Sequence, residues 1–185
     1  MQHGKALAYG HRSWDQILHK ISELAITRET ADFSAEAKAK QYLGKPPASA
    51  SQIGDAEKLL QLTLPNDYKE FLLTSNGFDK FTSIGVTISS IDKVDYYINV
   101  DRDQVEVWTE NLEDANPQFA NKFANSIIIG GADEEQQLLL IPIENNECEC
   151  WFFANWAAGE TVYPNFRFYM EEQLQRLESD YYRKP

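Results

Sequence analysis

Carboxylates are the residues of this chain whose type and spacing come nearest to a chemical site. Asp101 and Asp103 flank an arginine, and Glu134 and Glu135 follow a pair of glycines closely. The first pair could begin a calcium loop, but Val105 stands where a further oxygen ligand is needed, so a solvated helix face is the simpler interpretation. The second pair could do acid-base work. Adjacent carboxylates just after Gly-Gly are more typical of an exposed turn.

The two cysteines, Cys148 and Cys150, are separated by one residue in a segment with the pattern of a strand, so they are expected to point to the same face. A disulfide between them would be strained. All three histidines lie more than a hundred residues upstream, so a tetrahedral metal site is not expected. We interpret both cysteines as small apolar side chains of a reduced protein, and we expect neither a metal site nor a cofactor.

Signature motifs of the common enzyme classes are absent from the sequence. It has no P-loop, no dinucleotide-binding glycine pattern, no zinc-protease helix motif and no nucleophile elbow. The histidines have no Ser or Cys that the sequence pairs with them. We therefore expect a binding protein without catalytic residues. An enzyme that uses surface carboxylates stays open as an alternative.

The negative charge lies in the second part of the chain. Of a net charge of −12, residues 1–47 carry seven basic and five acidic side chains, a balance of +2, whereas residues 48–185 carry ten and 24, a balance of −14. Residues 92–114 hold eight carboxylates and residues 133–149 hold six. Such a field repels phosphate backbones and anionic membranes and attracts basic protein surfaces. We expect a basic protein partner, with neither nucleic acid nor membrane as a partner, although the charge could serve solubility alone.

Our candidate partner-binding residues combine these carboxylates with one aromatic residue. We hypothesise that carboxylates of the two windows form one negative face, although the windows could also lie on opposite sides of the domain. Trp156, in an expected loop, could anchor a partner or pack over the sheet edge. The set is Asp101, Asp103, Glu106, Asp133, Glu134, Glu135 and Trp156.

Length and composition are typical of one globular domain. The chain has 185 residues, of which 43% are hydrophobic and 25% are charged, so it can bury one sizeable core. Its stretches without a charge are much shorter than the ~20 apolar residues of a membrane-spanning helix. Its first residues lack both the apolar run and the cleavage pattern of a secretory signal. We therefore expect a cytoplasmic protein.

Helical periodicity dominates the first part of the chain. Apolar residues recur at helical spacing through residues 13–25, behind a capping-box pattern, and a shorter helix is expected over 34–43. The run KPPASAS that follows has the composition of a linker and places a boundary near residue 48. One domain is therefore expected over 1–185, with residues 1–47 as a helical extension and residues 48–185 as the core.

Two further helices are expected to meet at a tight joint. SQIGDAEKLLQL, beginning at Ser51, should present Leu59 and Leu60 to a core together with its other apolar residues. The next helix should begin near Pro65, with Asn76-Gly77 as its stop.

The second half of the chain changes to strand periodicity. Ile84, Val86 and Ile88 alternate, which predicts a strand with one buried face. A helical stretch that opens at Ser90 is expected to run through the acidic window. The β-rich segments SIIIGG, QLLLIPI and CECWFFANW then indicate an antiparallel meander, and a helix is expected over 165–178. We predict an α+β fold with helices packed against an antiparallel sheet.

One long run carries a family resemblance. IGDAEKLLQLTLPNDYKEFLLTSNGF resembles the signature of the SUKH superfamily, which includes yeast cell-wall-assembly regulators and many bacterial immunity proteins. The pattern is a Glu in an amphipathic helix, a Leu-Pro pair, an acidic-Tyr-Lys helix start and a closing Asn-Gly. The matching residues are Glu57, Leu64, Pro65, Asp67, Tyr68, Lys69, Phe71, Leu72, Asn76 and Gly77. ISSIDKV, SIIIGGADEEQQLLLIPI and the strand at Trp151 are also similar, so the resemblance covers roughly residues 48–178.

The resemblance implies a SUKH-like α+β fold and a binding role without catalysis. Bacterial relatives neutralise a toxin domain, often a nuclease, by binding it in the cytoplasm. An acidic inhibitor suits such a basic target, because charge attraction speeds association. We therefore expect an immunity protein with a basic toxin as its partner. A regulatory scaffold of the cell-wall-assembly-regulator type stays open, as do the toxin's identity and the oligomeric state.

Overall fold

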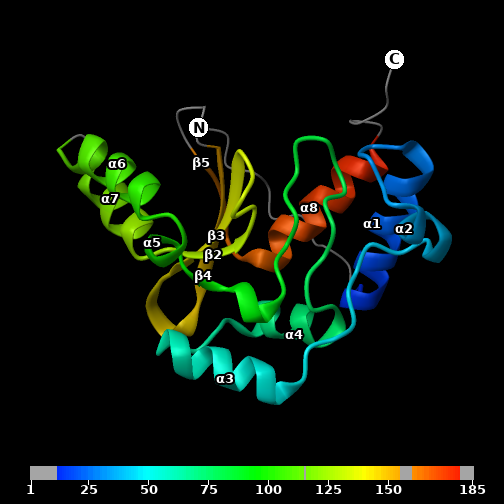
Figure 1. Cartoon of the computed structure of the whole chain (residues 1–185), viewed down its shortest axis with the longest axis horizontal. Coiled ribbons are helices and arrows are strands. Elements are labelled where there is room, and N and C mark those ends of the chain that lie inside the picture. The colour runs from blue at the N-terminus through cyan, green and yellow to red at the C-terminus, as the bar shows by residue number, and fades with distance from the viewer. Residues whose placement is uncertain (1–11, 115, 155–159, 180–185) are drawn as a thin grey trace.

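The computed structural model describes residues 12–114, 116–154 and 160–179. In this part of the chain, eight α-helices surround a five-stranded antiparallel sheet whose strand order follows the sequence (Figure 1). The helices are α1 (Trp14–Arg28), α2 (Ala35–Lys40), α3 (Ala50–Leu60), α4 (Asn66–Thr74), α5 (Tyr97–Val100), α6 (Arg102–Glu113), α7 (Pro117–Ala124) and α8 (Phe166–Glu178). The strands are β1 (Asp95–Tyr96), β2 (Ile127–Gly130), β3 (Gln136–Pro142), β4 (Cys148–Ala154) and β5 (Glu160–Tyr163). Two single 3-10 turns are η1 (Ile91–Lys93) and η2 (Glu144–Asn146). The predicted α+β class and antiparallel sheet are confirmed.

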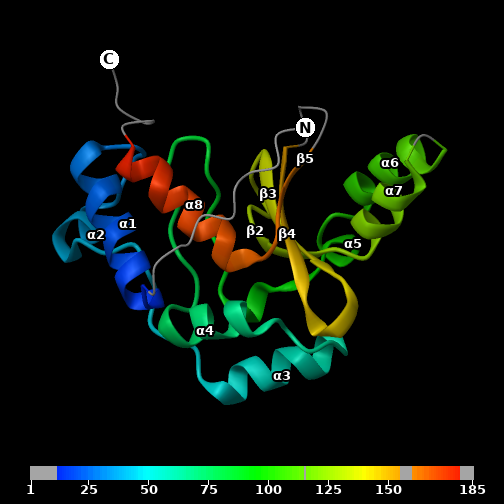
Figure 2. The same ribbon diagram turned by 180° about the vertical axis from the view of Figure 1, so that it is seen from behind.

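The sheet separates two apolar cores. Side chains of a strand alternate between its faces, so Leu138 joins one core and its neighbour Leu139 joins the other. The larger core lies between the sheet and helices α1, α3, α4 and α8, and the smaller core lies between the sheet and helices α5, α6 and α7. Figure 2 shows α1 and α8 on one side of the strands and α5, α6 and α7 on the other. Strand β4 lies between β3 and β5 with apolar groups on both faces, which accounts for its consecutive aromatic residues.

The N-terminal helices form part of the main core. The indole of Trp14 stacks on Phe166 of α8 at 5.7 Å between ring centroids and meets Phe71 of α4 edge-on at 5.6 Å. After the end of α2, the backbone N–H of Leu43 donates a hydrogen bond to Oγ of Ser22 in α1 at 3.1 Å. The predicted capping box of the first helix, between Ser13 and Gln16, is present. Residues 12–47 therefore pack into the same core as the rest of the domain.

The motif run forms two helices joined by a carboxylate. Oε1 of Glu57 accepts the backbone N–H of Leu64 at 2.9 Å and lies 3.2 Å from Nζ of Lys69, so the end of α3 is held against α4. Phe71 is fully buried, as are Tyr68 and Leu72, so these three residues form the core face of α4. Helix α4 ends at Thr74 with Ser75 as its C-cap, so the predicted stop at Asn76-Gly77 lies just beyond the end of the helix. Gly77 has a φ of 103°, a conformation that favours glycine.

The strand predicted around Val86 is wrong. Residues 82–87 are turn and irregular structure, Ile84 is 55% exposed, and Ile88 makes isolated bridges to Phe78 and Gly130 instead of a strand. The place beside β2 is taken by β1, which pairs with residues 127–128. Alternating apolar residues gave the signal, but long-range pairing decides whether such a short segment joins a sheet.

Other expectations about individual elements also need correction. The long helix expected from Ser90 is divided into η1, β1, α5 and α6, since β1 pairs with β2 at this point. Leu59, expected in the core, is 85% exposed, whereas Leu60 is buried. Helix α2 ends at Lys40 and not at Gly44. Helix α7 and strand β5 were not expected, although Asn116 before Pro117 is a helix-start signal.

Candidate functional site

Three segments that are distant in the sequence lie side by side at one end of the sheet. A chain of β-bridges joins Gly44 to Phe78, Phe78 to Ile88 and Ile88 to Gly130. The stop of α4, the 87–90 segment and the β2–β3 turn therefore become neighbours. They border an open cleft of about 690 Å³. This motif cleft is lined by residues 45–47, 76–77, 87–90 and 131–134, together with Gln52 and Lys93.

Glycines allow the walls of the motif cleft to approach one another. A Cβ on Gly77 would lie 3.0 Å from the carbonyl oxygen of Ile88, and a Cβ on Gly130 would lie 2.7 Å from that of Thr87. Gly131 has a φ of 74° in the adjoining turn. Larger residues at these positions would push the 87–90 segment away.

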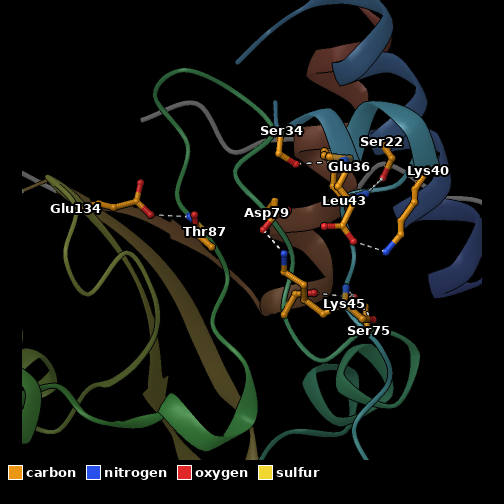
Figure 3. Close-up of polar contacts among 12 residues, drawn as sticks. Ser22, Ser34, Glu36, Lys40, Leu43, Lys45, Ser75, Asp79, Thr87 and Glu134 are labelled. Atoms are coloured by element: carbon orange, nitrogen blue, oxygen red, sulfur yellow. Dashed lines mark hydrogen bonds and ion pairs between the residues drawn. The ribbon is translucent and has the colours of Figure 1, made fainter. Parts of the chain in front are cut away.

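Polar side chains of the motif region form hydrogen bonds between the same walls. Oδ1 of Asn76 accepts the backbone N–H of Ile91 at 2.7 Å. Oγ of the buried Ser75 accepts the backbone N–H of Lys45 at 2.8 Å and donates to the carbonyl oxygen of Gly77 at 2.6 Å (Figure 3). The Asn-Gly signature therefore acts as a structural joint between the α4 stop, the 43–47 connection and η1.

Glu134 also makes contacts between these walls and is not a free surface carboxylate. Its Oε1 accepts the backbone N–H of Thr87 at 2.8 Å, and its Oε2 lies 3.3 Å from Nζ of Lys80 (Figure 3). Its side chain is only 25% exposed. The expectation of an exposed turn carboxylate is wrong for Glu134. It holds for the neighbouring Asp133 and Glu135, which are exposed.

The predicted carboxylates of the other window lie on α6. Asp101 is the N-cap of this helix and accepts the backbone N–H of Gln104 at 3.0 Å. Asp103 is exposed, and Glu106 lies 3.3 Å from Arg102 in an exposed ion pair. Helix α6 packs on the smaller core through Val105.

The six predicted carboxylates are therefore divided between two parts of the fold. Those on α6 belong to the layer that covers the smaller core. Glu134 reaches instead toward Thr87 in the segment that packs on the larger core through Val86 and Ile88. Trp156 lies outside the described residues.

A second groove continues from the motif cleft along α3. It has a volume of about 660 Å³ and shares Gln52 and Lys93 with the cleft. One wall is α3 and the other is formed by residues 91–95 and 99–100. We call this the α3 groove. Leu59 is one of its lining residues, although helical spacing had predicted this leucine in the core.

A third, smaller cavity of about 380 Å³ lies where α4 and α8 begin. Oδ2 of Asp67 accepts the backbone N–H of Arg167 there at 2.9 Å. Burial raises the pKa of Asp67 more than this hydrogen bond lowers it. Burial also raises the pKa of the nearby Cys148 thiol to about 12, so this cysteine is neutral at physiological pH.

Neither a metal cluster nor a membrane span is found within residues 12–114, 116–154 and 160–179. Groups of three or more His, Cys, Asp or Glu side chains that could hold a metal ion do not occur there. The helices of the same ranges are also too short or too polar to cross a bilayer.

The comparison with known families agrees with the arrangement of the motif run. The sequence model of the SMI1/KNR4 family, also called SUKH-1, matches residues 47–172. The chain belongs to the SMI1/KNR4 family. This confirms the SUKH resemblance of the motif residues. The family match begins just before α3 and includes the lining of the α3 groove and most of the motif cleft. It leaves out α1 and α2, although both pack into the core of this SMI1/KNR4 protein.

A curated relative matches a shorter stretch. The uncharacterized protein YnaB of Bacillus subtilis (strain 168) is 46% identical over 56 residues. The match covers 30% of this chain and 38% of YnaB, so it spans just over a third of that relative's length.

Proposed function

We propose that this SMI1/KNR4 protein is a non-catalytic immunity protein that neutralises a basic toxin domain, such as a nuclease, by binding it directly in the cytoplasm. The observation that carries the proposal is the construction of the motif cleft. The family motif supplies its walls, and the polar motif side chains are used to hold those walls together. The outcome is a shaped, open surface, which suits recognition of a partner.

The absence of catalysis is part of the proposal. A catalytic acid, base or nucleophile must reach the reacting atoms of a substrate. At the motif cleft, Asn76 and Glu134 bind backbone N–H groups of the fold, and Lys45 lies 2.6 Å from Asp79. These side chains are therefore occupied in structural contacts.

Charge supports a basic partner. Exposed carboxylates lie on α6 at Asp103 and at the β2–β3 turn at Asp133 and Glu135. These carboxylates lie in two different parts of the fold, and each group attracts a basic protein over a screening length of about 8 to 10 Å at physiological ionic strength. We propose that one or both contribute to fast association with the toxin.

Co-expression tests the function directly. The full chain is expressed in bacteria together with the toxin-like domain encoded beside its own gene, and growth is compared with an empty vector and with an unrelated acidic protein of similar size. We expect the full chain alone to restore growth and to form a stoichiometric complex with the toxin in gel filtration. Absence of both rescue and complex would contradict the proposal.

Two further outcomes separate the alternatives. A chemically altered toxin, found by mass spectrometry after incubation with this chain, would indicate an enzyme. Stable association with several cellular proteins and none with the toxin would favour a regulatory scaffold.

A further inference from the structure

We propose that the α3 groove is the docking site for an amphipathic segment of the toxin in which apolar side chains are flanked by Lys or Arg. The inference rests on the proposed function, because it names the surface and the chemistry of that same binding event.

The apolar part of the groove is open to solvent. Leu59 on α3 is 85% exposed and Val100 on the opposite wall is 42% exposed. Ala56, Leu60 and Val94, which also line the groove, are buried. A partner side chain placed here would remove Leu59 and Val100 from water together, which is a main source of binding free energy.

The groove carries carboxylates around these apolar groups. Asp55, Asp92 and Asp95 line it, with Lys93 as the one cationic residue among the described lining residues. Asp55 is engaged by Lys58 at 2.8 Å, and Asp95 accepts from Asn99 at 3.0 Å. Asp92 is exposed and has no hydrogen bond or ion pair within the described part of the chain. Charge complementarity therefore favours a basic segment and disfavours an acidic one.

The groove is held open by contacts of the fold itself. The hydroxyl of Tyr96 donates to the carbonyl oxygen of Leu60 at 3.0 Å, which ties the far wall to the end of α3. Asn76 holds the start of η1 from the other side. A preformed groove loses little conformational entropy when a partner binds.

The length of the groove suits a short helix or an equivalent segment. Helix α3 has 11 residues, which is about 16 Å at 1.5 Å per residue. Because the groove shares Gln52 and Lys93 with the motif cleft, a segment docked along α3 can continue toward the exposed Asp133. This continuity connects the family motif to the docking surface.

Binding of the full chain to the purified toxin domain encoded beside its gene tests the groove. The two variants are Leu59→Ala, which removes the apolar anchor, and Asp92→Lys, which reverses the unpaired charge. We expect each variant to raise the Kd about tenfold or more. Asp92→Lys should also slow association at low salt.

Matched controls lie outside the groove. Leu73→Ala removes another leucine that is 48% exposed, on α4, and Asp32→Lys reverses an exposed carboxylate in the α1–α2 connection. Both should leave the Kd within about twofold, and all four variants should keep the wild-type Tm, because exposed substitutions change stability little.

A synthetic probe tests the chemistry without the toxin. A 14-residue helical peptide with Leu on one face and Lys elsewhere should bind the full chain in a fluorescence anisotropy titration. The same peptide with Glu in place of Lys should not bind. The Leu59→Ala variant should bind the Leu-Lys peptide more weakly than the wild type does, and the Leu73→Ala variant should bind it equally well.

The outcomes separate the inference from the proposed function. If the wild type binds the toxin and Leu59→Ala and Asp92→Lys bind it with the same affinity, the groove is not the docking site. The proposed immunity function would be unaffected by that result. Loss of binding in Asp103→Lys alone would place the toxin on α6 instead. No binding of the toxin by the wild type would overturn the function and the inference with it. Equal binding of the Leu-Lys and Leu-Glu peptides would overturn the proposed partner chemistry.

Discussion

The side-chain oxygen of Asn76 accepts the backbone N–H of Ile91 at 2.7 Å. The bond joins the segment after α4 to η1. The first of these segments lines the motif cleft, and η1 lines the α3 groove. A single family-motif residue thus fixes the geometry of both surfaces. The Asn76 side chain therefore makes a contact inside the fold, and the surface that we propose for binding is the shape that this contact maintains.

Replacing Asn76 tests this joint. Asn76→Ala leaves the partly buried N–H of Ile91 without its partner, which should lower the free energy of unfolding by about 1 to 3 kcal/mol. Asn76→Asp keeps an acceptor oxygen and should lose less. Urea unfolding of the two variants beside the wild type measures the difference. Equal losses in the two variants would show that the oxygen is not what matters.

The N-terminal helix should be needed for stability although the family match does not include it. Trp14→Ala removes the ring that packs on Phe71 and Phe166, and should cost about 3 to 5 kcal/mol of unfolding free energy. Glu23→Ala, an exposed change on the same helix, should stay within about 0.5 kcal/mol. Denaturant unfolding measures both. A wild-type midpoint for Trp14→Ala would mean that α1 is an appendage.

Neighbouring glutamates in the β2–β3 turn should behave differently. Glu134→Ala breaks the hydrogen bond with Thr87 and the contact with Lys80, and should cost about 1 kcal/mol. Glu135→Ala removes an exposed carboxylate and should change stability by less than about 0.5 kcal/mol. Thermal unfolding of the pair decides the matter, and the prediction fails if the two variants melt together.

Asp67 should make stability depend on pH. Burial raises its pKa in the folded state above the ordinary value of about 3.9, so its favourable contribution is complete below that pH and is lost as the pH rises through the raised value. Asp67→Asn keeps an oxygen for the N–H of Arg167 without the buried charge. The variant should therefore be more stable than the wild type at pH 7, and its advantage should shrink toward pH 4.

Urea unfolding of both proteins at several pH values between 4 and 7 gives this difference directly. Comparing the two proteins at each pH removes the contributions of the other carboxylates. An advantage that stays constant across the range, or that grows as the pH falls, would contradict the assignment to Asp67.

Local sequence determined the elements whose contacts lie within one helix or one hairpin. The spacing of Tyr68, Phe71 and Leu72 fixes the buried face of α4, because successive helical turns bring these positions together whatever surrounds them. The meander of β2, β3 and β4 follows from β-rich runs separated by turn residues. The family signature at Glu57 and Asn76 was also visible in the sequence.

Tertiary structure alone decided the elements and surfaces that depend on distant partners. Leu59 and Leu60 are neighbours about 100° apart on a helix, so only the packing of α3 determines which one is buried and which one lies at the edge of a groove. The 82–88 segment alternates like a strand, yet β1 takes the place beside β2. Glu134 and Glu135 are neighbouring residues of the same type. The bond to the backbone N–H of Thr87, 47 positions away in the sequence, is made by Glu134. Such contacts join residues far apart in the chain, and their geometry depends on how the two layers pack against the sheet.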